Sequence, residues 1–476
     1  MKKALAIDMG ATSIRGILGW VCNGKLETEE VMRLEHRLVE KDGRVRWQWE
    51  KLISCIEDTI LQYAGQIDSV GVDTWGVDFG VLDEKGTLVS DPISYRDPQH
   101  VCGYEKALKM LGGRKLFLET GTQLMPINTL FQLITLQELC PYEWEKADRL
   151  LMMPDLVSYM LCGSAVAEET ILSTAQVMDL KSIRLDDALL ECFGICSDLF
   201  APMVQAGTKL GTTVSAKSEK LCAADPVDVI AVCGHDTASA VLLTEAFQDP
   251  ECLFLSCGTW SLFGALSNQA FLSELAYECA MTNELSYGQH TMFFKNVTGL
   301  YLLEKLKEEL EEEEGRKIGF EEITAYVLAH PNRSGCIDMD APQFAKAHVQ
   351  ARSEISVYLK KQGRELPTRA FDYFRIVYES LVEKYVETRM SIEKITKKKY
   401  KALHMIGGGS KSELLCQMTA DHLCIPVIAG PSEATAYGNL IIQLIAEKEI
   451  ADIAEGLALV KEAARAKTYL PHCLEL

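Results

Sequence analysis

Two segments far apart in the chain follow the same pattern of small, polar and apolar residues. When one residue is dropped from the first turn, glycine, serine and leucine positions align between residues 7–18 and 255–266: Gly10, Ser13, Gly16 and Leu18 with Gly258, Ser261, Gly264 and Leu266. Each segment has the form of a β-hairpin, because two strand-like runs flank a turn of small and hydroxylated residues. The repeat predicts two domains of related design, residues 1–242 and 243–476, each opening with such a hairpin.

Length and charge limit the classes of protein to which the chain can belong. With 476 residues it is long enough for two well-buried cores. A net charge of -20 makes a nucleic-acid partner unexpected. No apolar run reaches the ~18 residues needed to cross a bilayer, so no membrane association is expected. Asp8 falls where a signal peptide needs its apolar region, which favours a mature N-terminus.

The sixteen cysteines predict a reducing compartment and not a metal site. They form no Cys-x-x-Cys pair, and Cys192 and Cys196 have no nearby His or Cys to complete a zinc set. We therefore expect buried, reduced thiols in a cytoplasmic protein.

Residues 228–241 predict a strand, a turn at Gly234 and a helix. This order places the turn at the carboxyl edge of a sheet, where open α/β sheets bind ligands. Asp236 in the turn could accept a proton from a substrate hydroxyl. It could equally cap the helix, as Asp often does, and the stretch alone leaves both interpretations open.

The first hairpin and the segment near Trp75 each allow a binding and a structural interpretation. Backbone N–H groups, hydroxyls and Arg15 at the first bend could hold phosphate oxygens, with Asp8 facing a metal ion, or the segment is an ordinary hairpin. Trp75, Gly76 and Asp78 could offer a sugar a flat face and a hydroxyl acceptor, or form a strand pair around a core Trp. Asp155 is expected to cap the helix of residues 153–161.

Three glycines, Gly407 to Gly409, separate a predicted strand over residues 402–406 from a helix that begins near Ser412. Glycines at this place let a bulky anion approach the backbone and the N-terminus of the helix. The segment is not a P-loop, because Lys411 follows Ser410 where that motif has Gly before Lys.

Together these motifs resemble the FGGY carbohydrate kinases. The resemblance rests on Asp8-x-Gly-x-Thr-Ser-x-Arg15, Gly234-His-Asp236, Ser256-x-Gly-Thr259 and Gly407-Gly-Gly409, with further runs at residues 72–79, 95–97, 128–132, 153–155 and 295–296. It implies an α/β protein with the two-domain actin/hexokinase-like (ribonuclease H-like) ATPase fold and a cleft between the domains. The first domain is then expected to bind the sugar and the second the nucleotide.

The resemblance also implies roles for individual residues. Asp236 is expected to be the catalytic base. The residues expected to line the sugar are Gly76, His235, Asp236, Thr237 and Asn296. The residues expected to contact ATP are Ala11, Thr12, Ser13, Ile14, Arg15, Gly258, Thr259, Glu304, Gly407 and Gly408. Asp8 is expected to lie beside Mg²⁺ through water, which makes ATP and Mg²⁺ the implied cofactors; the oligomeric state stays open.

Two positions depart from the usual pattern of the family. Many members carry Lys and Trp in the segment that corresponds to Thr129 and Gln132, and their absence agrees with the branch that phosphorylates L-rhamnulose at its 1-hydroxyl. That reaction, in rhamnose metabolism, is the expected function. The alternatives are a kinase for another ketose, such as L-fuculose, and a non-catalytic sugar or nucleotide sensor. At Glu304, where an amide is common, an acid would repel phosphate, so a ribose or adenine contact is favoured.

Overall fold

The computed structural model describes residues 1–330, 335–345, 349–463 and 466–472. The chain divides into two compact units. The first unit comprises Met1–Leu243, Leu266–Phe293 and Glu433–Arg465, and the second comprises Thr244–Ala265, Phe294–Ser432 and Ala466–Leu476. These units group residues that are in contact, whereas the predicted division at residues 242 and 243 concerns contiguous segments and stays a prediction.

The first unit contains most of the secondary structure. Its strands are β1 (Lys3–Met9), β2 (Ser13–Cys22), β3 (Lys25–Glu35), β4 (Leu38–Lys41), β5 (Arg44–Trp47), β6 (Ser69–Thr74), β7 (Phe79–Leu82), β8 (Arg149–Met152), β9 (Ala167–Glu168), β10 (Met178–Asp179), β11 (Arg184–Leu185), β12 (Met203–Val204), β13 (Lys209–Thr212), β14 (Asp228–Ile230) and β17 (Thr282–Leu285). Its helices are α1 (Trp49–Tyr63), α2 (Val101–Leu111), α3 (Gly113–Thr120), α4 (Thr129–Leu139), α5 (Pro141–Lys146), α6 (Met153–Cys162), α7 (Glu169–Leu172), α8 (Asp187–Cys192), α9 (Glu219–Cys222), α10 (Asp236–Val241), α11 (Glu274–Glu278), α17 (Ala434–Ala446) and α18 (Ile453–Ala463).

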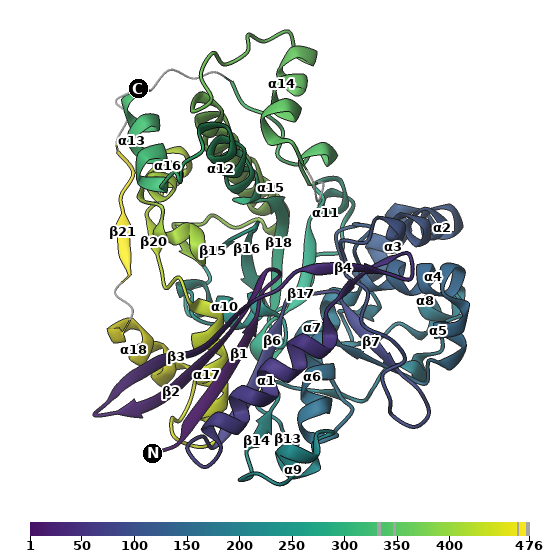
Figure 1. Cartoon of the computed structure of the whole chain (residues 1–476). Helices are drawn as coiled ribbons and strands as arrows, with labels where there is room; N and C mark the ends of the chain where they lie inside the picture. The colour runs from purple at the N-terminus through teal and green to yellow at the C-terminus, as the bar shows by residue number, and fades with distance from the viewer. Residues whose placement is uncertain (331–334, 346–348, 464–465, 473–476) are drawn as a thin grey trace. The chain divides into compact units, whose positions relative to one another are not determined.

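The main sheet of the first unit has the strand order β13-β14-β6-β1-β2-β3 (Figure 1). Strands β1, β2 and β3 form an antiparallel meander, which confirms the predicted first hairpin. Strands β6 and β14 extend the sheet parallel to β1. Because the carboxyl ends of parallel strands meet at the same edge of a sheet, the residues that follow β1, β6 and β14 gather at that edge.

Helix α17, close to the end of the first unit's sequence, covers one face of this sheet. Gly71 on β6 permits the close approach, because a Cβ there would lie 2.8 Å from Asn439 Oδ1. Gly438 does the same where α17 meets α10, because a Cβ there would lie 1.9 Å from the Ser239 carbonyl. Polar bonds fix the register: Asn439 donates to Asp73 at 2.6 Å, and Gln443 donates to the Leu5 carbonyl at 3.0 Å.

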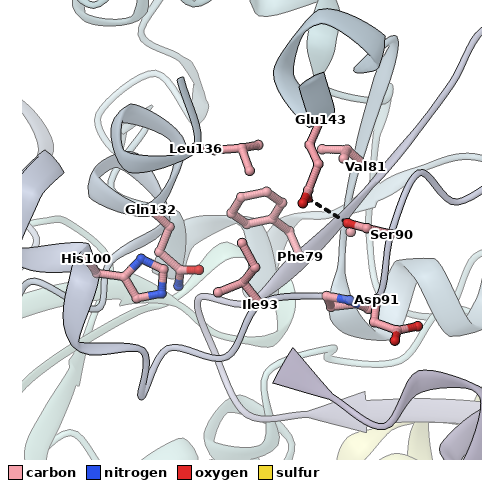
Figure 2. Close-up of a pocket in the computed structure, with 11 residues that line it drawn as sticks. Phe79, Val81, Ser90, Asp91, Ile93, His100, Gln132, Leu136 and Glu143 are labelled. Atoms are coloured by element: carbon pink, nitrogen blue, oxygen red, sulfur yellow. Dashed lines mark hydrogen bonds between the residues drawn. The ribbon is translucent and has the colours of Figure 1, made fainter. Parts of the chain in front are cut away.

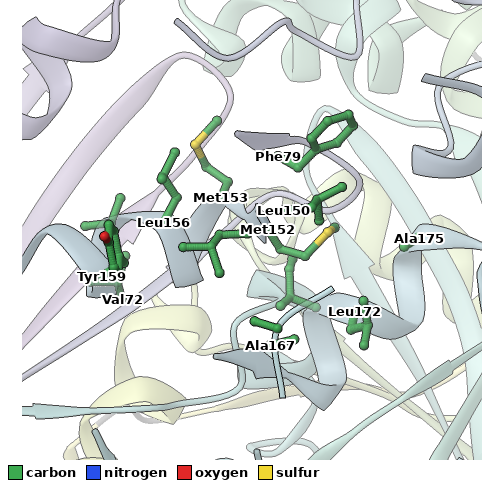
Figure 3. Close-up of a cluster of buried hydrophobic side chains, with 14 of the residues drawn as sticks. Val72, Phe79, Leu150, Met152, Met153, Leu156, Tyr159, Ala167, Leu172 and Ala175 are labelled. Atoms are coloured by element: carbon green, nitrogen blue, oxygen red, sulfur yellow. The ribbon is translucent and has the colours of Figure 1, made fainter. Parts of the chain in front are cut away.

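A large apolar cluster fills the interior of the first unit. Figure 3 shows the part of it where β7, β8 and the start of α6 meet, with Phe79, Met152 and Met153 among the side chains drawn. These residues are buried on all sides, as expected for a nearly continuous apolar run over residues 150–153. Through its contact with β6, α6 joins this cluster to the main sheet.

A small pocket opens beside β7 (Figure 2). It is lined by Phe79, Gly80, Val81, Ser90, Asp91, Pro92, Ile93, His100, Gln132, Leu136 and Glu143. The hydroxyl of Ser90 donates to Glu143 at 2.6 Å on one side. Among these lining residues, all of which the structure describes, none is predicted to bind sugar or ATP.

The second unit repeats the design of the first. Its strands are β15 (Cys252–Cys257), β16 (Trp260–Ser267), β18 (Thr291–Thr298), β19 (Ala402–Ile406), β20 (Val427–Ala429) and β21 (Lys467–Tyr469), and its helices are α12 (Tyr301–Glu314), α13 (Phe320–Ala329), α14 (Ala351–Lys361), α15 (Asp372–Thr396) and α16 (Glu413–Leu423). The strand order is β18-β16-β15-β19-β20-β21, and helices α12 and α15 pack side by side (Figure 1). Strands β15 and β16 form the predicted second hairpin, and β19 and β20 extend it in parallel, as β6 and β14 do in the first unit.

Two expectations about side chains are wrong. Asp155 does not cap α6, because its carboxylate oxygens accept the Glu168 N–H at 3.2 and 3.3 Å. The described cysteines are free thiols, but Cys102, Cys192, Cys196 and Cys424 are exposed, since they lie on the outer surfaces of short helices or at helix ends. Among the described helices, none combines the length and apolar character needed to cross a bilayer.

Candidate active site

Asp236 lies at the first residue of α10, just beyond the carboxyl end of β14. Two bonds fix the turn that precedes it: the Gly234 N–H donates to Glu168 Oε2 at 2.9 Å, and the Thr74 N–H donates to the Gly234 carbonyl at 2.8 Å. The side chain of Asp236 is 32% exposed, so a hydroxyl can reach it. The capping interpretation is wrong, because His235 occupies the cap position and, within the described chain, no side chain makes the capping bond.

The neighbours of Asp236 set its charge. Burial raises the pKa of Asp236, whereas His235 and the Thr237 hydroxyl, which donates to Oδ1 at 3.1 Å, lower it. His235 Nε2 lies 3.5 Å from Asp236 Oδ1. Burial lowers the pKa of His235, but Glu284, Asp236 and Glu168 outweigh that effect and leave the pKa raised. His235 therefore tends to stay protonated, and it lies beside a carboxylate that can accept a proton.

Two further carboxylates lie at the same sheet edge. Asp8 and Asp73 are register partners on β1 and β6. Burial raises the pKa of both, and Asp236 adds to the increase in each case. Asp73 Oδ1 is buried and has no hydrogen-bond partner among the described residues. The edge is therefore rich in negative potential, which a cation would relieve.

Residues 10–13 of the first hairpin bend are at least partly exposed, whereas the side chain of Ile14 is buried. The Gly10 N–H donates to the Ser13 carbonyl at 2.9 Å and closes the turn. Ala11 and Ser13 are half-buried and Thr12 is exposed, but the Ile14 side chain lies in the core, so only its backbone can meet a ligand. Arg15 is paired with Asp8 and with Glu433, both in the first unit. Its charge is therefore shared between two carboxylates.

The segment around Gly76 is held in an unusual backbone shape. Val77 has a φ of 70°, which a β-branched residue rarely adopts. The Val77 N–H donates to Thr174, and Thr129 and Gln132 donate to the Val77 carbonyl. Thr129 and Gln132 thus fix the peptide next to Gly76.

Trp75 and Asp78 are structural. Trp75 is 6% exposed, and its ring lies 4.0 Å from that of Trp47. Asp78 accepts the indole N–H groups of Trp47 and Trp75 at 2.7 and 2.9 Å, and burial raises its pKa to about 6. The interpretation in which Trp75 and Asp78 offer a face and an acceptor to a sugar is therefore wrong, because both side chains are buried in the core.

In the second unit, the predicted nucleotide contacts of two loops come together. β15 and β19 are parallel neighbours, so Gly258 and Gly407 follow adjacent strand ends. A Cβ at Gly407, where φ is 79°, would lie 2.9 Å from the Cys257 carbonyl, which explains the glycine there. Gly408 faces open space, with no described atom within 4 Å of a Cβ placed on it. The two loops leave backbone exposed for an anion.

The start of α12 joins the same loops. The Gly299 N–H donates to the Thr259 carbonyl at 3.1 Å, and the Leu300 N–H donates to the Gly258 carbonyl at 2.9 Å. Glu304 is exposed on the first turn of this helix. Asn296 lies on β18, also in the second unit, two residues before the strand ends. The structure thus gathers the second-unit residues into one region and the first-unit residues into another.

Comparison with known proteins decides the family. The N-terminal domain of the FGGY family of carbohydrate kinases matches residues 3–242, and the C-terminal domain of the same family matches residues 253–447. The chain belongs to the FGGY family of carbohydrate kinases. A curated relative from Bacteroides thetaiotaomicron, named rhamnulokinase, is 36% identical over 469 residues, which cover 98% of this chain and 95% of that protein. A rhamnulokinase from Bacillus subtilis is 32% identical over 476 residues, with coverage of 98% and 95%.

Solved FGGY kinase structures share the fold. The ligand-bound xylulose kinase from Lactobacillus acidophilus has a TM-score of 0.78 at 16% identity and covers 99% of this chain and 94% of its own. The glycerol kinase from Plasmodium falciparum with ADP has a TM-score of 0.79 at 14% identity, with coverage of 99% and 94%. The predicted two-domain α/β fold is confirmed. Membership in the FGGY kinases makes this protein a phosphotransferase with an alcohol acceptor, for which ATP is the co-substrate and a sugar the acceptor.

Two carboxylates close to residues 234–236 were not predicted from the sequence. Glu168 accepts the Gly234 N–H, and Glu284 lies 3.1 Å from His235. Both come from short strands, β9 and β17, that are distant in sequence from residues 234–236. No local motif marks them among the 68 acidic residues of the chain, so only the tertiary contacts reveal them.

Proposed function

We propose that this FGGY kinase transfers the γ-phosphoryl group of ATP to the 1-hydroxyl of L-rhamnulose, in rhamnose metabolism. The observation that carries the proposal is the partly exposed carboxylate of Asp236 at the end of β14, beside His235. The near full-length similarity to proteins named rhamnulokinase supports the choice of sugar.

In the proposed mechanism Asp236 is the general base that takes the proton of the sugar hydroxyl as the oxygen attacks the γ-phosphorus. Phosphoryl transfer needs positioning and charge neutralisation more than covalent help from the protein. Gly76, His235, Thr237 and Asn296 are proposed to hold the sugar. Since Thr237 is 5% exposed and already donates to Asp236, its part is to orient the base as much as to meet the substrate.

The ATP phosphates are proposed to meet two glycine hairpins and one glycine loop. The contributing residues are Ala11, Thr12, Ser13, Ile14 through its backbone, Arg15, Gly258, Thr259, Gly407 and Gly408. Arg15 becomes available if a phosphate displaces one of its two carboxylate partners, or if a cation binds Asp8 and weakens the Asp8–Arg15 pair. Glu304, an exposed acid, is proposed to contact the ribose or the adenine, because it would repel phosphate.

Mg²⁺ is proposed to bind near Asp8. Within the described residues, no group of three or more His, Cys, Asp or Glu side chains is arranged to hold a metal ion. Mg²⁺ in phosphoryl transfer does not need such a cage, because it keeps several waters and binds substrate phosphates. Asp73 Oδ1, which has no hydrogen-bond partner among the described residues, and the buried Asp8 fit a cation at this edge. When bound, the ion would neutralise charge on the phosphates, while Asp8 holds its water.

The partners are proposed to be the sugar and ATP alone. The net charge of -20 disfavours nucleic acid and anionic membrane surfaces. A cytoplasmic location is proposed, because ATP is the co-substrate.

The other candidate functions are a kinase for a related ketose such as L-fuculose, and a non-catalytic sensor.

A coupled assay of ADP release, with and without sugar, tests the proposal. The purified protein is offered a panel of ketoses and polyols, and L-rhamnulose is expected to give the highest kcat/KM. A higher kcat/KM for another ketose would replace the substrate, and no sugar-dependent ADP release with any member of the panel would favour the sensor.

Asp236→Asn tests the base. We expect sugar phosphorylation to fall by at least ~10²-fold, the low end for general base catalysis, with nucleotide binding retained. Asp228→Asn is the matched control, because Asp228 lies at the opposite end of β14. Near-normal turnover by the Asp236 variant would remove this residue from the mechanism.

A further inference from the structure

We propose that Glu284 is a positioning residue for the base: it holds the His235 ring in place as an imidazolium beside Asp236, and so keeps Asp236 ionised. The proposal rests on the proposed function of Asp236. It assigns a role to Glu284, whose side chain is the third member of a chain of contacts that runs from Glu284 to His235 to Asp236.

The geometry of the chain of contacts is fixed at each member. Glu284 Oε2 lies 3.1 Å from His235 Nδ1 and both side chains are 8% exposed. Within the described structure neither atom makes a hydrogen bond, so this contact is an ion pair. His235 Nε2, on the opposite side of the ring, lies 3.5 Å from Asp236 Oδ1. One nitrogen therefore lies at ion-pair distance from Glu284 while the other faces the base.

Strand β17 holds Glu284 firmly. On one side of it, the Asn283 N–H donates to the Gly121 carbonyl at 3.0 Å. On the other side, the Leu285 N–H donates to Ser173 at 2.8 Å. All of these residues belong to the first unit, as do His235 and Asp236. The carboxylate is thus anchored through both of its chain neighbours.

The charges around the ring explain why it carries a proton. The groups that face His235 are all acidic: Glu284 on β17, Asp236 on α10 and Glu168 on β9, and together they raise its pKa against the effect of burial. The groups that interact with Asp236 are His235, the carboxylates Glu284, Asp8 and Asp73, and the phenol of Tyr95. Arg15 is paired with Asp8 and also acts on Asp73. His235 is the cation that acts directly on Asp236, so loss of its charge would remove the main opposite charge beside Asp236.

The sign of the effect of Glu284 on Asp236 follows from two opposed influences. Directly, the Glu284 charge raises the pKa of Asp236. Indirectly, Glu284 keeps His235 protonated, and that cation lowers the pKa of Asp236. The indirect influence wins, because His235 lies at 3.5 Å and its effect on Asp236 is the larger one. Removal of the Glu284 charge should therefore raise the pKa of Asp236.

Glu284→Gln keeps the shape of the side chain and removes its charge. We measure kcat/KM for L-rhamnulose from pH 5.5 to 9.5 at saturating ATP. The acid limb of the profile is expected to move up by about one pH unit, the low end for the influence of one nearby charge. Above the pKa of His235 the ring is neutral in both proteins, so the two profiles should converge at high pH.

Asp97→Asn is the matched control. Asp97 is also a buried carboxylate of the first unit with a cationic partner, Arg44 Nε at 2.9 Å. Its variant is expected to keep the acid limb of the unmodified enzyme. If Glu284→Gln instead lowers kcat/KM equally at all pH values, or leaves the profile unchanged, Glu284 has only a structural role and the proposal falls.

A second measurement does not depend on activity. The nine histidines are labelled with ¹⁵N, and the signals of His235 are identified by their loss in His235→Asn. In the unmodified protein His235 is expected to titrate above pH 6.5, and in Glu284→Gln about one pH unit lower. Titration of His235 below pH 6.5 in the unmodified protein overturns the proposal even if the variant does not fold. If the titration behaves as expected but L-rhamnulose is not phosphorylated, the substrate proposal fails and the Glu284–His235 contact stands.

Discussion

Glu168→Gln is a direct test of how the turn before Asp236 is held. The Glu168 side chain is buried, and its Oε2 accepts four hydrogen bonds: from the Gly234, Thr170 and Ile171 N–H groups and from the Thr170 hydroxyl. Despite these donors, burial raises the pKa of Glu168 from 4.5 to about 7. The folded protein therefore holds a proton that the unfolded chain has released over this pH range.

The sign and the size of the effect follow from linkage. A carboxyl whose pKa is raised in the folded state makes its full contribution to the stability of the folded protein below pH 4.5. That contribution is lost as the pH rises through about 7. The step from 4.5 to about 7 corresponds to about 3 kcal/mol of unfolding free energy, at about 1.4 kcal/mol for each pH unit. Gln cannot ionise, so the variant should lack this loss.

The assay is guanidinium unfolding of both proteins at pH 5, 6, 7 and 8, followed by tryptophan fluorescence. The unfolding free energy of the variant relative to the unmodified protein should rise by about 2.5 kcal/mol between pH 5 and pH 8, because part of the full step lies below pH 5. The pH dependence carries the test, because a Gln amide at the place of Oε1, which has no partner among the described atoms, costs about 1–3 kcal/mol at every pH. Glu191→Gln, at an exposed position of α8, should keep the pH dependence of the unmodified protein. Parallel curves for the Glu168 variant and the unmodified protein would refute the reasoning.

Three further changes test other parts of the structure. Thr259→Val should raise the KM for ATP more than the KM for sugar in steady-state assays. A change confined to the KM for sugar would show that the second hairpin does not bind ATP. Gly438→Ala should lower unfolding free energy by about 1–3 kcal/mol and reduce kcat, because its Cβ would lie 1.9 Å from the Ser239 carbonyl in the helix that carries Asp236; an unchanged melting temperature would show that the helices adapt freely. Chelation by EDTA should stop phosphorylation without changing the melting temperature, and a large loss of stability would reveal a structural metal.

Local patterns predicted the elements, and distant contacts decided the details of the site. Strand β19 over Ala402–Ile406 has the predicted bounds, because a short apolar run that ends at a glycine defines it. The position of Asp236 beyond β14 followed from the same local logic. The contacts of Asp155 and Trp75 could not be predicted from local patterns. Asp155 bonds to a strand that begins twelve residues later, and Trp75 packs on Trp47 from another strand. Such pairings depend on the topology of the sheet and leave no mark in the neighbouring sequence.

Helix α17 has a consequence for the synthesis of the protein. On the ribosome, residues 1–243 are translated long before Asn439 and Gln443, which satisfy buried polar groups on β1 and β6. Until that helix emerges, the inner face of the nascent sheet exposes Gly71, Asp73 and their apolar neighbours, a kind of surface that invites aggregation or chaperone binding. The first unit can therefore be completed only after most of the chain has been made. A product truncated before residue 434 would carry Asp236 but lack the helix against which α10 packs.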